Sequence, residues 1–200
     1  MNRIKHLFIS VAALIGLCVM GGVAHAQSAT GTIGVTGTVT LNCVVVTGGS
    51  GSAFSGTIAL GELDDPTTGY LLGSLSGASP SGAEIKSFQV NCNGGHASID
   101  LKATRLSNAS GTALAGYSRN IDYTTDLILT KSDSSTQSFS YTTAPALPAD
   151  TTGTLGGRMA NAAGNVVVQI HNLSAENGAT SILEAGSFSS TITVAISPIT

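Results

Sequence analysis

The sequence contains few charged side chains, and this scarcity excludes several classes of protein. Only 10% of the residues are charged, against about 25% in an average soluble protein. The 11 acidic residues outnumber the 8 basic ones, so no basic surface is available to attract nucleic acid or an anionic bilayer. Serine, threonine and glycine take the polar positions while aliphatic residues supply a core, so the low charge does not indicate disorder.

The chain is also poor in the side chains that carry chemistry. It has no tryptophan, which argues against a sugar-stacking platform. His96 and His171 are the histidines left once the first 26 residues are set aside, too few for a copper–zinc sandwich, and we interpret both as strand or surface residues. Asp122 and Asp126 share one phase of a strand, as an acid–base pair or a solvated strand face would. The segment Gly73–Gly77 has leucine where a nucleophile elbow has serine. We expect no enzyme, no cofactor and no metal site.

Residues 1–26 have the pattern of a secretory signal peptide. A basic start is followed by the apolar run Leu7–Val23 and the small-residue cleavage motif Ala24–Ala26, which makes Gln27 the first mature residue. An uncleaved membrane anchor is the alternative, but the run is short for a span of about 20 residues and no stop-transfer charges follow it. No later segment is apolar enough to cross a bilayer, so we expect no membrane span after the signal is removed.

The cysteines indicate one disulfide. Cys18 leaves with the signal peptide, and Cys43 and Cys92 remain. An even pair in an oxidising compartment is typical of a disulfide, and closing a loop of this length stabilises a fold by about 4 kcal/mol. Two free thiols or a metal pair are the alternatives. Two ligands so far apart, without a nearby histidine pair, make a poor zinc site.

The segment Thr30–Val46 alternates with a period of two, which is the periodicity of a β-strand. One phase is mostly apolar and consists of Ile33, Val35, Gly37, Val39, Leu41 and Cys43. The segment is long for one strand, since the usual length is about 5–6 residues. We expect its first half to be made for another molecule and its second half, ending at Cys43, to open the chain's own fold. The alternative is an ordinary edge strand that packs on its own domain.

The rest of the chain has strand periodicity without any sustained helical period. Strands are predicted at Thr57–Leu63, Tyr70–Leu75, Ile85–Asn91, His96–Thr104, Arg119–Thr130, Gln137–Thr142, Val166–Leu173 and Phe188–Ile196. Asn93–Gly95 is a strong hairpin signal, and residues 145–157 are expected to be a connection. Short strands separated by glycine-rich turns favour one antiparallel β-sandwich domain.

Three stretches carry a resemblance to a known family. Gly37–Cys43 is like a first strand that ends at a cysteine. Ile58–Leu63, followed by Ser87–Gly94, is like a hydrophobic strand and a second cysteine strand. Gly186–Ile196 is like a closing strand, although it has phenylalanine and serine where tyrosine and aspartate are usual. In this order and spacing the chain resembles the chaperone–usher pilins, and within them the spore coat protein U domain family.

The resemblance implies an immunoglobulin-like sandwich that lacks its last strand and leaves an apolar groove open. The groove would be covered first by a periplasmic assembly chaperone, and then by the N-terminal extension of a neighbouring subunit at an outer-membrane usher. It divides the mature chain into a donor extension, 27–38, and a pilin-like domain, 39–200. The expected plugs are Ile33, Val35, Gly37, Val39 and Leu41, and the closing strand presents Phe188, Ile192, Val194 and Ile196.

The expected function is therefore structural. The resemblance implies a subunit secreted through the periplasm to the cell surface, where it polymerises into a fimbrium for adhesion or biofilm formation. A self-contained immunoglobulin-like surface or binding protein that does not polymerise is the alternative. A periplasmic enzyme is the third possibility, and no constellation of residues in the sequence supports it.

Overall fold

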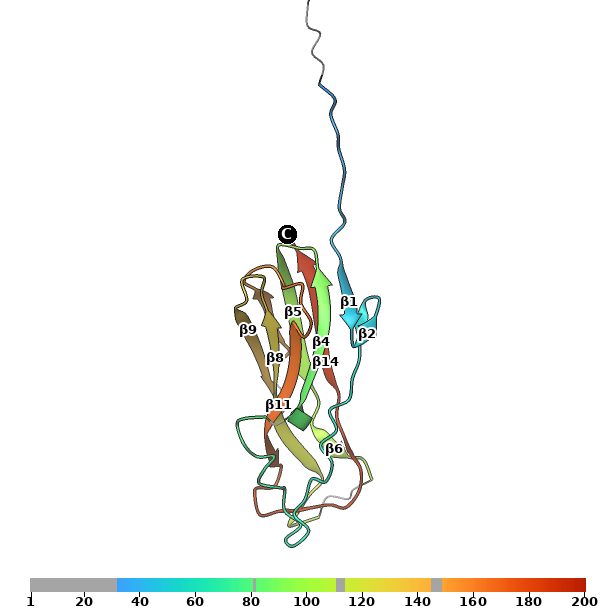
Figure 1. The fold of residues 1–200 in the computed structure, drawn as a ribbon. Coiled ribbons are helices and arrows are strands. Elements are labelled where there is room, and N and C mark those ends of the chain that lie inside the picture. The colour runs from blue at the N-terminus through green and yellow to red at the C-terminus, as the bar shows by residue number, and fades with distance from the viewer. Residues whose placement is uncertain (1–31, 81, 111–113, 145–148) are drawn as a thin grey trace, which may run out of the picture. The chain divides into compact units, whose positions relative to one another are not determined.

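The computed structural model describes residues 32–80, 82–110, 114–144 and 149–200 (Figure 1). Two compact units divide the chain, Met1–Thr38 and Val39–Thr200, and we call the second unit the body. Residues 32–42 belong to no strand, so the long strand predicted at Thr30–Val46 is shorter than expected and begins at Cys43. The predicted signal peptide, 1–26, lies outside the described residues.

The body is all β. Its strands are β1 (Cys43–Thr47), β2 (Gly49–Ser50), β3 (Ala53–Phe54), β4 (Ile85–Cys92), β5 (His96–Ala103), β6 (Leu106–Asn108), β7 (Tyr117–Ser118), β8 (Asn120–Thr130), β9 (Thr136–Thr142), β10 (Thr151–Leu155), β11 (Val166–Ala175), β12 (Ile182–Leu183), β13 (Phe188–Ser189) and β14 (Ile192–Ile199). The helical element of the described residues is a 3₁₀ turn, η1 (Gly82–Glu84). No helix in the described ranges has the length and apolar character to span a membrane.

Two antiparallel sheets form a sandwich. The first has the order β1-β4-β11-β8-β6-β13, with β9 also paired to β8, and the second has the order β10-β5-β14. Alternate residues of both sheets point into one shared core, for example Leu127 and Val166 from the first sheet and Ile99 and Leu101 from the second, all 0–2% exposed. This arrangement confirms the predicted all-β sandwich.

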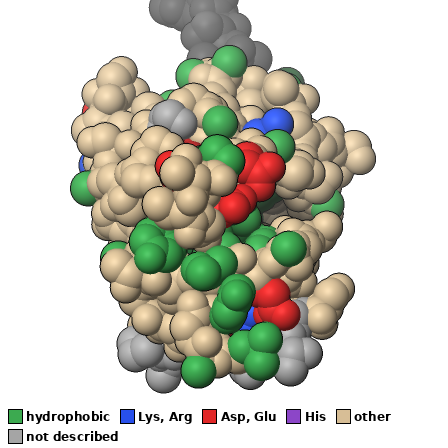
Figure 2. Space-filling model, turned by 90° about the horizontal axis from the view of Figure 1, so that it is seen from below, with side chains coloured by type: hydrophobic (Ala, Val, Ile, Leu, Met, Phe, Trp, Pro, Cys, Tyr) green, Lys and Arg blue, Asp and Glu red, His purple; other side chains and the backbone are tan. Residues whose placement is uncertain are grey.

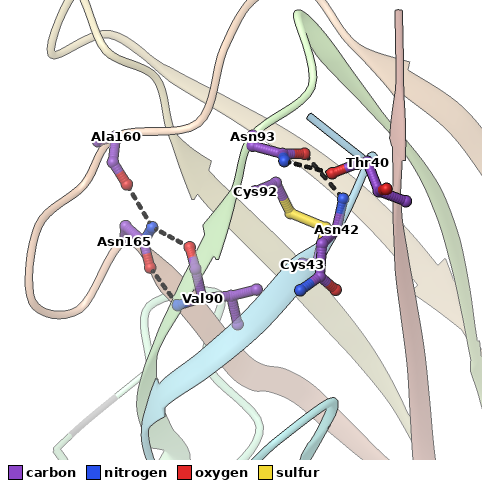
Figure 3. The surroundings of a disulfide bond; sticks show 8 residues. All are labelled: Thr40, Asn42, Cys43, Val90, Cys92, Asn93, Ala160 and Asn165. Atoms are coloured by element: carbon purple, nitrogen blue, oxygen red, sulfur yellow. Dashed lines mark hydrogen bonds between the residues drawn. A yellow bond between two sulfur atoms is a disulfide. The ribbon is translucent and has the colours of Figure 1, made fainter. Parts of the chain in front are cut away.

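The predicted disulfide is confirmed. Cys43 and Cys92 are direct cross-strand partners in the β1–β4 ladder, their Cα atoms are 4.1 Å apart, and their sulfurs are bonded. Figure 3 shows the bond beside the point where the chain enters β1. The disulfide therefore fastens the edge strand of the first sheet to the strand next to it.

The hairpin predicted at Asn93–Gly95 is wrong. β4 pairs with β1 and β11, whereas β5 pairs with β10 and β14. Because both edges of β4 are already occupied, the chain cannot fold back beside it and instead crosses to the other sheet. The glycines permit this tight crossing, since a Cβ atom on Gly94 would lie 2.6 Å from the carbonyl oxygen of Ile199.

Two of the predicted strands do not form. Residues 57–63 run from β3 toward the far end of the body without a strand partner, and Tyr70–Leu75 makes only isolated bridges, at Tyr70 and Leu71. The apolar residues of Thr57–Leu63 are nevertheless the partly buried ones. Ile58, Leu60 and Leu63 pack against the core, while the residues between them are exposed. This segment has the side-chain pattern of a strand but no adjacent strand to bond.

Two further predictions differ in detail. The connection expected at 145–157 contains β10, which pairs with β5 along its whole length. The closing strand expected at Phe188–Ile196 is divided, because Phe188 pairs with β6 in the first sheet and Ile192 begins the pairing with β5 in the second. The chain changes sheets at Ser190–Thr191, where the Ser190 hydroxyl and the Thr191 amide both bond Thr104.

Candidate functional site

The two long sides of the sandwich differ in how they are closed. On one side, β9 and β10 are joined across the sheets by side chains. The Gln137 side chain donates to the Thr154 carbonyl (2.9 Å) and accepts from the Gly156 amide (2.8 Å), and the Thr151 hydroxyl donates to the Ser140 carbonyl (2.8 Å). These bonds cover the gap between the sheets and exclude water from the core there.

On the other side, the second sheet ends at β14, which pairs only with β5 among the described strands. Three inward residues of β14 stand directly opposite inward residues of β5: Ile192 opposite Ala103, Val194 opposite Leu101, and Ile196 opposite Ile99. The β5 members are 0–4% exposed, but their β14 partners are only partly buried. Directly opposite residues of two paired strands point to the same face of the sheet, so the β14 side chains face the core as their β5 partners do. The core is therefore fully covered at β5 but partly open to solvent at β14.

An apolar groove of about 450 Å³ fills this open side. One wall is the segment 54–60 and the other is formed by Phe188–Ser190 with β14. The floor is made of core side chains from four strands of the first sheet: Phe88, Leu106, Tyr123, Val168, Ile170 and Leu173. The segment 54–60, which beyond Ser55 belongs to no strand, and the edge strand β14 therefore flank a slot that exposes the core of the body.

Lys86 and several hydroxyl side chains line the groove together with the apolar residues. Among the floor residues named above, the one polar group is the Tyr123 hydroxyl. The Tyr123 hydroxyl lies 2.5 Å from the Ser190 hydroxyl, and the Ser190 hydroxyl also donates to the Thr104 carbonyl (3.0 Å). Burial raises the pKa of Tyr123, and its hydrogen bond to Ser190 opposes that shift in part. The remainder of the floor is hydrocarbon and aromatic ring, and Phe88 is further packed by Phe54, whose ring centre is 4.7 Å away.

Three of the four predicted closing-strand residues line this groove. Phe188, Ile192 and Val194 line it directly, and Ile196 is the next inward residue of β14 and is also partly buried. The sequence did not indicate the opposite wall, since Thr57–Leu63 was predicted to be a paired strand. It also did not indicate the floor. Leu106 begins a stretch, 106–116, whose sequence predicts a loop, whereas the structure forms β6 there, and Tyr123 has the periodicity of any buried strand.

The predicted donor residues are exposed. Ile33, Val35 and Val39 are 87–92% exposed, and Leu41 is 43% exposed. A Cβ atom added at Gly37 would meet nothing within 4 Å. These positions form a run of alternate apolar side chains with no cover of their own, and their role as a donor strand stays a prediction.

Asn93 holds the root of this run against the body (Figure 3). Its side-chain oxygen accepts from the Asn42 amide (2.7 Å), its side-chain amide donates to the Thr40 carbonyl (2.7 Å), and its backbone amide donates to the Asn42 carbonyl (3.0 Å). Residues 40–42 are thereby bonded to the β4–β5 turn just before the disulfide. The exposed apolar positions before Thr40 are therefore the part of the run that is free of such bonds.

The candidate acid–base residues do not share a site. Asp122 is 5% exposed and accepts two hydrogen bonds from the Arg105 guanidinium, at 2.7 and 2.6 Å. Asp126 lies on the outer face of the sheet and contacts His171 (3.0 Å). His96 contacts the Leu155 carbonyl (3.1 Å). In the described part of the chain, no group of three or more histidine, cysteine, aspartate or glutamate residues is placed to hold a metal ion.

Comparison with known proteins gave no match: no family model, no curated protein and no solved structure is similar to this chain.

Proposed function

We propose that this chain is a secreted, pilin-like structural subunit that polymerises by donating its N-terminal segment to the groove of the next copy. The observation that carries the proposal is the apolar groove between the segment 54–60 and β14, which leaves the core of an otherwise closed sandwich partly exposed. A missing strand would complete both flanks at once, because among the described strands β14 pairs along one edge only and residues 56–60 pair with none.

The exposed run before Thr40 has the chemistry that such a slot requires. A strand laid in the groove presents every second side chain to the floor, and Ile33, Val35, Gly37 and Val39 supply three apolar plugs and one gap. Exposed apolar side chains and a free strand edge on one molecule are an aggregation hazard unless they are matched. When one copy donates its segment to the next, the apolar run and the groove are both buried. Because this contact is head-to-tail and does not close on itself, it builds a fibre.

The proposal includes partners and a destination. The open groove needs cover before assembly, which a periplasmic chaperone supplies, and an outer-membrane usher then brings subunits together. The assembled fibre lies at the cell surface and serves adhesion or biofilm formation. The resemblance of Gly37–Cys43, Ser87–Gly94 and Gly186–Ile196 to chaperone–usher pilins supports these partners.

A complementation experiment in the native host tests the proposal. Deleting residues 27–36 leaves the groove but removes most of the plugs. Val194→Arg places a charge in the groove but leaves the donor run intact. Neither variant alone should form denaturant-resistant ladders in unboiled gels, whereas the two expressed together should form a dimer and nothing longer.

Ala195→Arg is the matched control, because Ala195 is exposed on the opposite face of the same strand. It should polymerise like the unaltered chain. Ladders from the deletion variant would overturn the donor assignment. A deletion variant that fails to fold as a monomer would instead favour the alternative, a self-contained immunoglobulin-like surface protein.

A further inference from the structure

One end of the body carries an exposed apolar patch. We call this end the lower end; it consists of the loops 61–72, 114–119 and 176–185, and Figure 2 views the body from this side, with hydrophobic side chains gathered across the surface. Leu114, Tyr117 and Ile182 are 56%, 39% and 36% exposed. Tyr117 and Ile182 are cross-strand partners in the β7–β12 pair, and the Tyr117 amide bonds the Leu114 carbonyl (3.1 Å). The three side chains therefore form one patch.

The patch is continuous with both walls of the groove. The wall 54–60 leads into the loop in which Tyr70 forms a bridge with Ile182. The other wall begins at Phe188, just after a segment whose carbonyls, at Glu184 and Ala185, accept hydrogen bonds from the Asn108 side chain (both 3.1 Å). A polypeptide segment that leaves the groove at the lower end is therefore expected to lie next to the patch.

The two ends of the body differ in charge. The lower-end loops contain five carboxylates and one cation, Arg119. Glu62 and Asp64 are close enough that the protonated Glu62 carboxyl donates a hydrogen bond to the Asp64 carboxylate, and this bond, together with the charge of Asp64, raises the pKa of Glu62. The opposite, upper end consists of the turns 93–96, 131–135 and 156–164, which contain two cations, Lys131 and Arg158, and one carboxylate. The Ser132 amide bonds the Arg158 carbonyl (2.9 Å), so the two cationic turns adjoin.

Strand direction decides which ends meet in a polymer. β14 runs from the lower end to the upper end, since its last residue, Ile199, pairs with His96. A donated strand that pairs antiparallel to β14, the more stable arrangement, runs downward and leaves the groove at the lower end. The donor's own body then follows without a spacer, because its residues 40–42 are bonded to Asn93 at its upper end.

We propose that the patch formed by Leu114, Tyr117 and Ile182 is the docking surface for the upper end of a second copy of this chain. The inference rests on the proposed function. The charge pattern agrees with the antiparallel direction, because the upper-end turns that carry Lys131 and Arg158 then meet the acidic lower end. In the parallel direction Lys131 and Arg158 of one copy would face the same residues of the next, which is unfavourable.

Photo-crosslinking in the assembled fibre tests the docking surface. Benzoylphenylalanine at position 117 is incorporated, light and heavy isotope-labelled chains are assembled together, and mixed-isotope crosslinked peptides are identified by mass spectrometry. The expected partners are residues 93–96, 131–135 or 156–164 of a neighbouring copy. The same probe at Ser138, exposed on β9, is the control and should yield no such peptide.

The outcomes separate this inference from the proposed function. Normal ladders with crosslinks from position 117 to a neighbour's lower end, or with none, would overturn the docking surface and leave donation intact. Absence of ladders from the unaltered chain would overturn both. A charge exchange gives a second test: Lys131→Glu with Arg158→Glu should slow assembly severalfold at low salt, and Glu62→Lys with Asp64→Lys in the same chain should restore it. Failure of that rescue would count against charge pairing between the two ends.

Discussion

Asn165 takes the place of a β11 strand partner for Val90, which pairs with Val45 of β1 along the other edge of β4. Its side-chain oxygen accepts from the Val90 amide (2.9 Å) and its side-chain amide donates to the Val90 carbonyl (2.7 Å), one position beyond the Phe88–Val166 pair. The same amide donates to the Ala160 carbonyl (2.6 Å). Asn165 is 1% exposed, so these bonds are made out of reach of bulk water and hold the upper parts of β4 and β11 together (Figure 3).

Asn165→Ala should lower the free energy of unfolding by about 2–4 kcal/mol, since it leaves a buried N–H and a buried C=O without partners. Urea titration followed by tyrosine fluorescence measures the change. Asn161→Ala, at an exposed position of the same loop, should shift the midpoint little. An equal loss in both variants would mean that the Asn165 bonds contribute nothing specific.

Arg105→Met should destabilise the body by about 2–4 kcal/mol, because it leaves the buried carboxylate of Asp122 without its cationic partner. The hydrogen bonds that the Arg105 guanidinium donates to Asp122 hold its pKa above the usual value, so no accessible pH removes its charge. The double variant Arg105→Met with Asp122→Leu should lose less, since no unpaired charge remains inside. If the double variant is the less stable one, the ion pair itself, rather than the stranded carboxylate, accounts for the loss.

Replacing Cys43 and Cys92 by serine should cost about 3–4 kcal/mol, the chain-entropy value for a loop closed across a separation of 49 residues. Unfolding in urea with and without a thiol reductant checks this. The reductant should lower the stability of the unaltered chain by a similar amount and leave the serine variant unchanged. A reductant effect on the serine variant would show that the loss has another source.

Stability should fall as the pH rises above about 10, partly because of Tyr123. Burial raises its folded-state pKa above the ordinary tyrosine value of 10.0, so the unfolded chain releases this proton first and is favoured as pH increases toward the folded-state pKa. Tyr123→Phe should flatten the alkaline decline measured by urea titration between pH 9 and 11. Tyr117→Phe, which removes an exposed tyrosine, should retain it. Equal slopes in all three proteins would contradict the assignment to Tyr123.

The disulfide and the long strands could be predicted from sequence because each depends on a local pattern. Alternating apolar residues in Ile85–Asn91, His96–Thr104 and Val166–Leu173 specify strands that bury one face, and β4, β5 and β11 form there. β10 escaped prediction because its inward residues are Thr151, Gly153 and Leu155, and only Leu155 is a large apolar residue. At Gly153 the Phe139 ring occupies the space that a side chain would take, since a Cβ atom added to Gly153 would lie 2.5 Å from the ring.

Which strands are neighbours could not be predicted from the same patterns. Asn93–Gly95 is a hairpin signal whenever an edge of the preceding strand is free, and here both edges of β4 are taken. Thr57–Leu63 alternates like a strand, yet none of the described strands lies beside it as a partner. The groove could not be predicted for the same reason, because it is the space that the missing neighbour of Thr57–Leu63 would fill.

The Asn93 contacts also determine how a pulling force on the N-terminal segment is transmitted to the body. A pull on the residues before Thr40 acts first on the hydrogen bonds between Asn93 and residues 40–42. If those bonds yield, the next connection is covalent, since the Cys43–Cys92 bond passes the force directly into β4. β4 shares it with β11 over four residue pairs, so the load is distributed as shear between central strands and does not peel the edge strand away.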